Sequence, residues 1–301
     1  MEKVKHKKRK LARGDILISS ISTVVVTLFA ICCILPFIYV FFVSFMPYSE
    51  YLENPLKMIP SHFVLTAYKE MLGYKLIKSG YGVTIFITIV GTLLSMFLLV
   101  ITAYPLSKTR LKGQKAIMTM IVFTMFFSGG MIPNYILMRD LHLIDTPWGM
   151  ILPDCFSAFF LIIMRSFIKI TVPVELEEAA KIDGANDIRI LFSIVVPIIK
   201  PAIATLAVYV SVSYWNNYFS AMLYELDRKN WPLSLVLREL VVENSTSSVS
   251  SVTQILNSLS RSHPFTLKMA AIIITTLPIL LVYPFMQRYF VKGIALGSVK
   301  G

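Results

Sequence analysis

The sequence is poor in charged residues, which make up 15% of its 301 residues, and it contains only three cysteines and four histidines. A soluble domain has about 25% charged residues. Here 56% of the residues are hydrophobic and the mean hydropathy is +0.70, which is more apolar surface than a soluble chain of this length can bury. The same abundance of large apolar residues excludes a disordered chain. The composition therefore predicts an integral membrane protein.

The sequence also lacks the residue patterns of catalytic and metal sites. Cys32, Cys33 and Cys155 lie in apolar stretches and form neither a disulfide framework nor a metal-ligand spacing. The histidines are scattered singly, and there is no G-x-x-x-x-G-K-[ST] phosphate loop or dinucleotide-binding glycine turn. We therefore expect no catalytic site, no metal and no cofactor bound by this chain. Any uphill transport must draw its energy from a partner.

Six segments are long and apolar enough to cross a membrane, which takes about 20 residues as a helix. The fourth is the weakest, because Asp154 and Arg165 lie near its ends. A carboxylate at the bilayer centre costs about 2.5–3.5 kcal/mol, and much less at the interface, so we place Asp154 at the outer end of this span. An all-α fold follows, with six transmembrane helices at residues 16–46, 80–106, 116–138, 148–168, 201–224 and 269–288.

The basic residues indicate the orientation, since Lys and Arg concentrate in cytoplasmic loops. With both termini inside, the inner segments hold 19 of the 29 basic and seven of the 17 acidic residues, which accounts for the formal net charge of +12. The basic run at the N-terminus is therefore interpreted as a membrane anchor and not as a nucleic-acid site. A cleaved signal peptide is disfavoured, because the following apolar run is too long and lacks a small-residue cleavage site. The predicted organisation is a cytoplasmic N-terminus (1–15), a first helix (16–46), an outer loop (47–78), a core (79–291) with an inner loop (169–200) and an outer loop (225–268), and a cytoplasmic tail (292–301).

The inner loop between the fourth and fifth helices is long and has the signals of ordered structure. Pro173 suits the first turn of a helix over residues 174–183, and Gly184 suits its C-terminal cap. Asn186 can cap a second short helix, which we expect to stop at Pro197 and Pro201. The loop is therefore predicted to form a pair of helices on the cytoplasmic face.

These residues carry a family resemblance. Glu178-Ala179-Ala180, then Gly184, then Ile194-Val195-Val196-Pro197 resembles the EAA loop of ABC importer permeases, E-A-A-x3-G-x9-I-x-L-P, with Val196 in place of leucine. An amphipathic helix pair lying at the membrane interface would explain the two helices but not this spacing.

The resemblance extends over most of the chain. Thr102 to Ser107, followed by Arg110-Leu111-Lys112-Gly113, is similar to a segment of carbohydrate-type permeases, as are Trp215-Asn216-Asn217-Tyr218 and the ending Gly297 to Gly301. The chain most resembles the maltose-permease-like group, in the branch associated with oligosaccharide uptake in Gram-positive bacteria.

The resemblance implies a function and a set of partners. The chain would be a permease subunit in a bacterial plasma membrane, forming half of a carbohydrate pathway with a second, different permease. An ABC ATPase dimer holding ATP and Mg would lie beneath it, and a solute-binding protein would deliver the ligand from outside. The residues expected to couple to the ATPase are Glu178, Ala179, Ala180, Asp183, Gly184, Ala185 and Pro197.

Polar and aromatic residues of the fifth helix are candidates for lining the pathway, because aromatic faces and amides suit sugar rings and hydroxyls. They are Tyr214, Trp215, Asn216, Asn217 and Tyr218. The alternative is that these side chains pack or hydrogen-bond between helices. The alternative function is a self-contained secondary carrier or facilitator for a polar solute, which the lack of charged residues at the centre of the confident spans disfavours.

Overall fold

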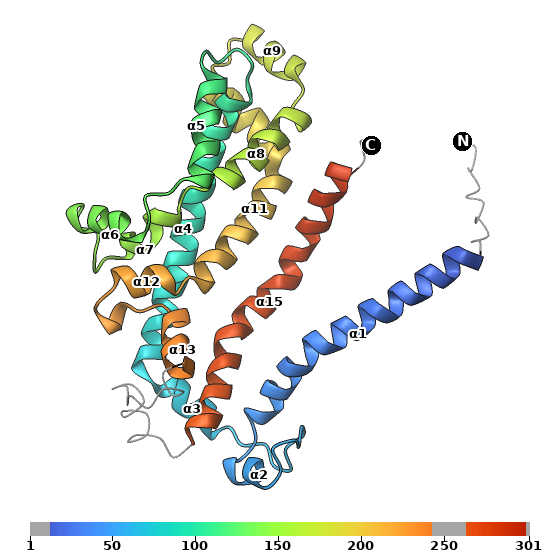
Figure 1. Cartoon of the computed structure of the whole chain (residues 1–301). Helices are drawn as coiled ribbons and strands as arrows, with labels where there is room; N and C mark the ends of the chain where they lie inside the picture. The colour runs from blue at the N-terminus through green and yellow to red at the C-terminus, as the bar shows by residue number, and fades with distance from the viewer. Residues whose placement is uncertain (1–12, 243–262, 299–301) are drawn as a thin grey trace.

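A computed structural model describes residues 13–242 and 263–298, and within these ranges the chain is built from helices and loops (Figure 1). The four longest helices are α1 (Arg13–Val43), α4 (Lys75–Ser107), α11 (Val196–Asn216) and α15 (Pro264–Ser298). The shorter helices and turns are α2 (Tyr48–Glu53), α3 (Thr66–Gly73), α5 (Gln114–Phe126), α6 (Met131–Asp140), α7 (Pro147–Ile151), η1 (Leu152–Asp154), α8 (Ala158–Thr171), α9 (Val174–Ile182), α10 (Asp187–Ile190), η2 (Leu191–Val195), α12 (Phe219–Tyr224), η3 (Arg228–Asn230) and α13 (Leu233–Val242).

Four helical stretches of the described chain are long and apolar enough to cross a membrane, and the number rises to six if each of two bent pairs is one span. The pairs are α5 with α6, bent by 112°, and α7–η1 with α8, bent by 54°. The single helices predicted over 116–138 and 148–168 are thus each divided in two. Gly130, at a φ of +87°, breaks the first. At the second break the Ser157 side chain caps the new helix α8 by accepting the Phe160 N–H.

The core forms where α4 packs between α8 and α11. Its largest side chains that are almost fully buried include Leu99 of α4, Leu161 and Met164 of α8, and Ile199 of α11. Large apolar side chains on the outward faces, such as Phe86 and Ile89, are exposed. Contiguous exposed apolar surface of this kind is typical of a lipid-facing wall.

The first helix lies apart from this core. From Ile18 to Ile38 every side chain is exposed, and Figure 1 shows α1 diverging from the other helices toward its amino end. Near its carboxyl end it packs against α15, and Ser44 just beyond it shares a 2.6 Å hydrogen bond with the hydroxyl of Tyr68 in α3. The assignment of α1 as a membrane span therefore depends on its hydropathy, because few other helices of the described chain contact it.

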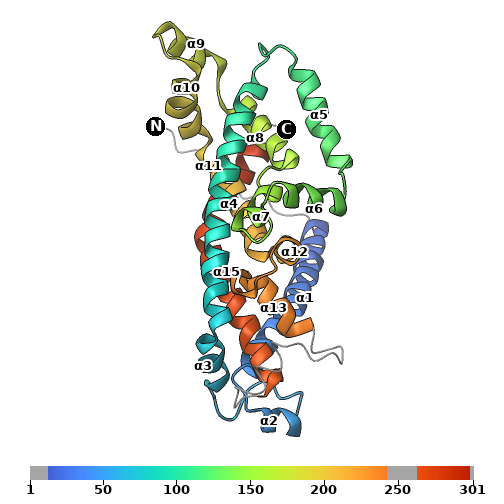
Figure 2. The same ribbon diagram turned by 90° about the vertical axis from the view of Figure 1, so that its left-hand side faces the viewer.

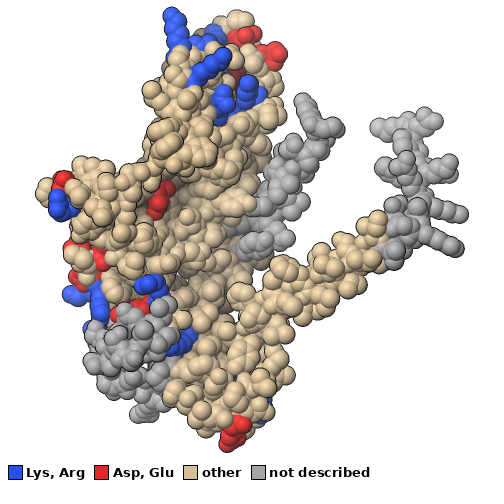
Figure 3. All heavy atoms as spheres, viewed as in Figure 1, with Lys and Arg blue, Asp and Glu red and all other residues tan. Residues whose placement is uncertain are grey.

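Figures 1 and 2 place α9 and α10 at one end of an elongated molecule and α2 and α3 at the other. The carboxyl end of α4 and of α15, and the amino end of α1, are the ends nearer to α9. Figure 3 shows charged side chains gathered at the α9 end, around α6, α12 and α13, and at α2, with an almost uncharged flank along α1. The charges are thus grouped at separate levels along the long axis.

One expectation about the inner loop is wrong. The second short helix does not stop at Pro197 and Pro201 but continues as α10, η2 and α11, a run from Asp187 to Asn216. Proline cannot donate an N–H and its ring crowds the carbonyl four residues earlier. Here η2 is a π-helical turn directly before Pro197, and such a wider turn accommodates the missing hydrogen bonds.

Candidate coupling loop and central polar cluster

Helix α9 ends in a hydrogen-bonded turn that depends on a glycine. Gly184 has a φ of +80°, a conformation that costs other residues energy. The Gly184 N–H donates to the Lys181 carbonyl at 3.0 Å, and the Ala185 N–H donates to the Ala180 carbonyl at 2.9 Å. This pair of bonds is the Schellman motif, which satisfies the last carbonyls of a helix. The sequence prediction of a helix over 174–183 with Gly184 as its cap therefore describes the local structure.

The residues expected at the coupling surface divide into two groups. Glu178, Ala179, Asp183 and Gly184 are exposed, whereas Ala180 and Ala185 are half-buried and pack against the core. Pro197 is also exposed, but it lies in α11 and not on the surface formed by α9 and its cap.

Large apolar side chains surround the exposed group. Val174, Leu176 and Ile182 are 62%, 45% and 87% exposed. The exposed face of α9 therefore combines apolar side chains with Glu178 and Ala179 at one end of the molecule, and such a face is suited to docking into a groove.

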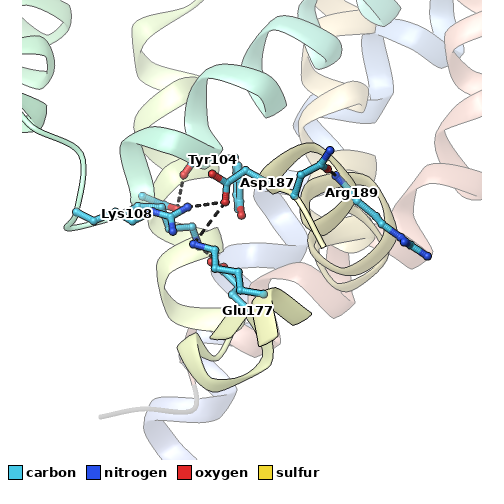
Figure 4. A network of polar contacts seen from close by, with 9 residues as sticks. Tyr104, Lys108, Glu177, Asp187 and Arg189 are labelled. Carbon is cyan, nitrogen blue, oxygen red and sulfur yellow. Dashed lines mark hydrogen bonds and ion pairs between the residues drawn. The ribbon is translucent and has the colours of Figure 1, made fainter. Parts of the chain in front are cut away.

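A group of charged side chains joins α9 and α10 to the carboxyl end of α4 (Figure 4). We call it the α9 cluster, and it comprises Tyr104, Lys108, Arg110, Glu177, Lys181 and Asp187. Lys108 forms an ion pair with Glu177, and its ammonium group lies 4.6 Å from the centre of the Tyr104 ring. Arg110 contacts Asp187 at 2.5 Å, and Lys181 lies 3.5 Å from the same carboxylate.

The two ion pairs of the α9 cluster differ in burial. The side chains of Lys108 and Glu177 are 17% and 7% exposed, whereas those of Arg110 and Asp187 are 51% and 58% exposed. Neither Lys108 nor Glu177 is singled out by the sequence. No local signal joins them, because they are 69 positions apart.

The carboxyl end of α4 is also held by α8 and by the start of α5. The Leu106 carbonyl accepts hydrogen bonds from Arg165 Nε at 2.7 Å and from Gln114 Nε2. A cationic side chain at this position satisfies a free carbonyl and favours the negative end of the helix dipole. Arg165 is thus a structural residue at the helix end.

A cleft of about 660 Å³ opens beside the α9 cluster. Phe97 and Ile101 of α4 line one wall, and Leu191 and Phe192 of η2 line the other. At this level the apolar side chains of α4 and η2 therefore do not fill the space between them, and the charged contacts of the α9 cluster span it.

The five pathway candidates do not share one face. Tyr214 is 3% exposed and donates from its hydroxyl to the Ile151 carbonyl at 2.9 Å. Trp215 points to α15, donating to the Thr275 carbonyl at 3.4 Å. Asn216 bonds within its own helix, and Tyr218 lies under the guanidinium of Arg238 at 5.2 Å.

Asn217 belongs to a second polar group, the Asp154 cluster, defined by Asp154, Asn217 and Ser220. The Asn217 amide donates to Asp154 Oδ2 at 2.7 Å, and the Ser220 hydroxyl donates to the same oxygen at 3.0 Å. The Asn217 side-chain carbonyl also accepts the Ser220 N–H of the first turn of α12 at 3.1 Å. The carboxylate and its donors thus join the break between η1 and α8 to the break between α11 and α12.

A cavity of about 280 Å³ lies beside the Asp154 cluster. Its polar lining comes from Asp154, Ser95, Ser157, Ser213 and Tyr214. Hydroxyl and carboxylate groups around a space of this size can exchange hydrogen bonds with a polar solute. Within the described residues no group of His, Cys, Asp and Glu is arranged to hold a metal ion.

The all-helical architecture with several membrane-length apolar helices is that of a multi-pass membrane protein, and comparison with known proteins identifies its family. Residues 8–296 match the family of binding-protein-dependent transport system inner membrane components, so the chain belongs to this family and is a multi-pass inner membrane protein.

Curated relatives and solved structures agree with this assignment. The chain is 43% identical over 274 residues, 91% of this chain and 95% of the relative, to the polygalacturonan/rhamnogalacturonan transport system permease protein YtcP of Bacillus subtilis (strain 168). It is 41% identical to the protein LplC of the same organism, over 89% of this chain and 90% of that one. A chain in the crystal structure of a bacterial ABC transporter involved in the import of the acidic polysaccharide alginate aligns with a TM-score of 0.84 and 33% identity, covering 93% of this chain and 99% of that chain.

Proposed function

We propose that this chain is the transmembrane permease subunit of an ATP-driven ABC importer and forms half of the pathway for a carbohydrate, an oligosaccharide in particular. The family membership supports the importer class. One relative is a polygalacturonan/rhamnogalacturonan transport system permease, and the similar solved structure belongs to a transporter involved in alginate import; both support a carbohydrate cargo. The observation on which the proposal depends is the glycine-capped α9, which exposes Glu178 and Ala179 at one end of the molecule.

The proposed topology has six spans, with α5–α6 and α7–η1–α8 each counted as one. It has both termini and the α9–α10 loop in the cytoplasm. Two observations support it. The amino end of α1 and the carboxyl ends of α4 and α15, which adjoin the segments proposed to be cytoplasmic, all lie toward α9. The basic residues predominate in these same segments. A basic excess of this kind is typical of the cytoplasmic side.

The proposed partners follow from what this chain lacks and exposes. An ATPase dimer would hold ATP and Mg and receive α9 in a groove, with the exposed apolar residues Leu176 and Ile182 buried in that contact. A second permease, different from this one, would complete the pathway, and an extracytoplasmic binding protein would deliver the solute. The proposed pathway passes the Asp154 cluster and the cavity beside it.

Substitution of Gly184 tests the coupling role. In Gly184→Asp the added Cβ meets no atom within 4 Å, so the change acts through the strained backbone of the cap and the new charge at the docking tip. We expect normal abundance in the membrane, with solute uptake and solute-stimulated ATP hydrolysis both lost. The matched control is Gly113→Asp, since Gly113 has the same φ of +80° and an equally open site but lies outside α9. Wild-type uptake and ATPase stimulation in Gly184→Asp would refute the proposal.

Extraction in mild detergent separates the two candidate classes. An importer subunit must co-purify with an ATPase and a second permease, whereas a secondary carrier would emerge alone or with copies of itself.

A further inference from the structure

Helix α9 has two covalent connections to the membrane-embedded core and a third connection that is not covalent. Along the chain it follows α8 and precedes α10, η2 and α11. Helix α4 is far away in sequence, yet it packs against both α8 and α11 in the centre of the core. Figure 4 shows that the carboxyl end of α4 meets α9 and α10 through the charged side chains of the α9 cluster.

The buried pair is the contact best suited to hold α9 against α4. The side chains of Lys108 and Glu177 are largely removed from solvent, so the attraction between them is screened little. The Tyr104 ring lies against the Lys108 ammonium and adds a cation–π contact. Arg110 and Asp187 lie in water, where such pairs contribute little.

Ile190 of α10 is buried in the core, but α9 itself adds only the small side chain of Ala180 to this packing. The cleft between Phe97 and Ile101 of α4 and Phe192 of η2 leaves the α10–η2 side of the contact partly open. Half-buried Ala180 and Ala185 pack against the core, but their small side chains give little area to resist a shift of α9. The position of α9 relative to α4 therefore depends on the Lys108–Glu177 pair more than on packed side chains.

We infer that Lys108 and Glu177 are positioning residues that fix α9 to the carboxyl end of α4, so that a displacement of α9 moves α4 together with α8 and α11. This inference rests on the proposed function, in which the ATPase displaces α9. Neither residue touches the ATPase groove in this scheme, because Glu177 faces the core while Glu178 faces outward. Coupling between distant sites needs such a contiguous mechanical connection with two discrete arrangements.

Charge reversal tests the pair in the assembled transporter, reconstituted with its ATPase, second permease and binding protein. In Lys108→Glu and in Glu177→Lys we expect the ratio of solute moved to ATP hydrolysed to fall by about tenfold, within the range found for residues that carry coupling. ATP hydrolysis itself persists, because the outward face of α9 is intact. The double variant Lys108→Glu/Glu177→Lys restores the attraction and is expected to recover most of the ratio. The exposed pair is the matched control: Arg110→Glu changes the ratio by less than about twofold.

A cross-link gives a second test that does not depend on how well the charge-reversed chains fold. In a chain whose native cysteines are replaced by serine, Lys108→Cys/Glu177→Cys removes the pair, and a short bifunctional thiol reagent then joins the two positions. If the pair holds α9 to α4 throughout transport, the cross-linked complex regains the coupling ratio of the cysteine-free parent. Loss of transport on cross-linking would show that the contact must break during each cycle and would overturn the inference.

The outcomes separate this inference from the proposed function. If Gly184→Asp leaves uptake unchanged, the proposed coupling role of α9 fails. If Gly184→Asp abolishes uptake but the single charge reversals keep the wild-type ratio, or the double reversal recovers nothing, then only the role of Lys108 and Glu177 fails.

Discussion

The α9 cluster and the Asp154 cluster are two polar groups on the same set of packed helices, and they are built differently. In the α9 cluster, charged side chains of opposite sign span a partly open cleft. In the Asp154 cluster, a carboxylate accepts hydrogen bonds from an amide and a hydroxyl. The Asp154 cluster also lies near a close contact between α4 and α11, where Gly91 meets the ring of Tyr214.

The difference indicates how motion can pass through the molecule. Close contact at Gly91 and Tyr214 leaves no space for α4 and α11 to slide past each other, since packed interiors resist continuous deformation. At the α9 end the contact depends on a few charged side chains, chiefly the buried Lys108–Glu177 pair, and not on close packing. We therefore expect the central region to move as a unit and the α9 end to be the place where that movement is imposed.

The largest predicted effect concerns the close contact between α4 and α11 at Gly91. A Cβ at Gly91 would lie 2.6–2.9 Å from three ring atoms of Tyr214, and that ring is buried and held by its bond to Ile151. Gly91→Ala is expected to lower the free energy of unfolding by about 2 kcal/mol through overpacking, measured as a lower melting temperature in detergent.

Gly82 provides the matched control on the same helix. A Cβ there meets nothing within 4 Å, so Gly82→Ala is expected to raise the free energy of unfolding by about 0.5 kcal/mol, because alanine favours a helix. Equal effects of the two alanines would contradict the tight contact.

The next effect concerns the Asp154 cluster. Asn217→Ala removes a donor to the Asp154 carboxylate and the acceptor of the Ser220 N–H, and is expected to cost about 1.5 kcal/mol of stability. Asn216→Ala, which removes only a bond within its own helix, is the control and should cost less than about 0.5 kcal/mol. Uptake measured at matched abundance then tests the pathway: normal transport in both variants would exclude a pathway role for these amides.

A smaller effect is expected from removing a single hydroxyl. Tyr214→Phe keeps the ring against Gly91 but loses the hydrogen bond to the Ile151 carbonyl, at a cost of about 1 kcal/mol. Thermal unfolding of the detergent-purified chain measures it. A loss as large as that of Gly91→Ala would show that the hydroxyl, and not the close approach of the ring, holds α4 and α11 together.

The smallest effect is predicted at the exposed edge of the α9 cluster. Arg110→Gln breaks the ion pair with Asp187, both side chains of which are more than half exposed, and should change stability by less than about 0.5 kcal/mol. Because added salt already screens such a pair, the difference from wild type should shrink further in concentrated salt. A difference that persists there would mean that Arg110 contributes by packing.

Local features of the fold could be predicted because their causes lie within a few residues. The bounds of α9 follow from Pro173, the acidic first turn and Gly184, and the long apolar runs indicate helices α1, α4, α11 and α15. The prediction that a helix stops at Pro197 failed because the π-helical turn before it absorbs the missing hydrogen bond. The bends after Phe126 and Asp154 were missed because apolar content carries no information on direction.

The pairing of polar residues could not be predicted. Asp154 was interpreted as an interfacial charge and Asn217 as a pathway candidate, yet they form one cluster across 63 positions. The pathway candidates were grouped by adjacency in sequence. In the fold Tyr214 lines the cavity beside Asp154 and Asn217 donates to Asp154, whereas Trp215 donates to Thr275 of α15. Neighbours along a helix point in different directions, so adjacency does not imply a shared site.

The sequence by itself determined that this protein is helical, lies in a membrane and carries a glycine-capped helix between two apolar runs, because hydropathy, helix capping and backbone strain act over a few residues. Only the tertiary structure decided which charges meet at the carboxyl end of α4 and which polar groups surround Asp154. Those contacts depend on the relative placement of helices that are distant in the chain, and burial strengthens the ones that are removed from water.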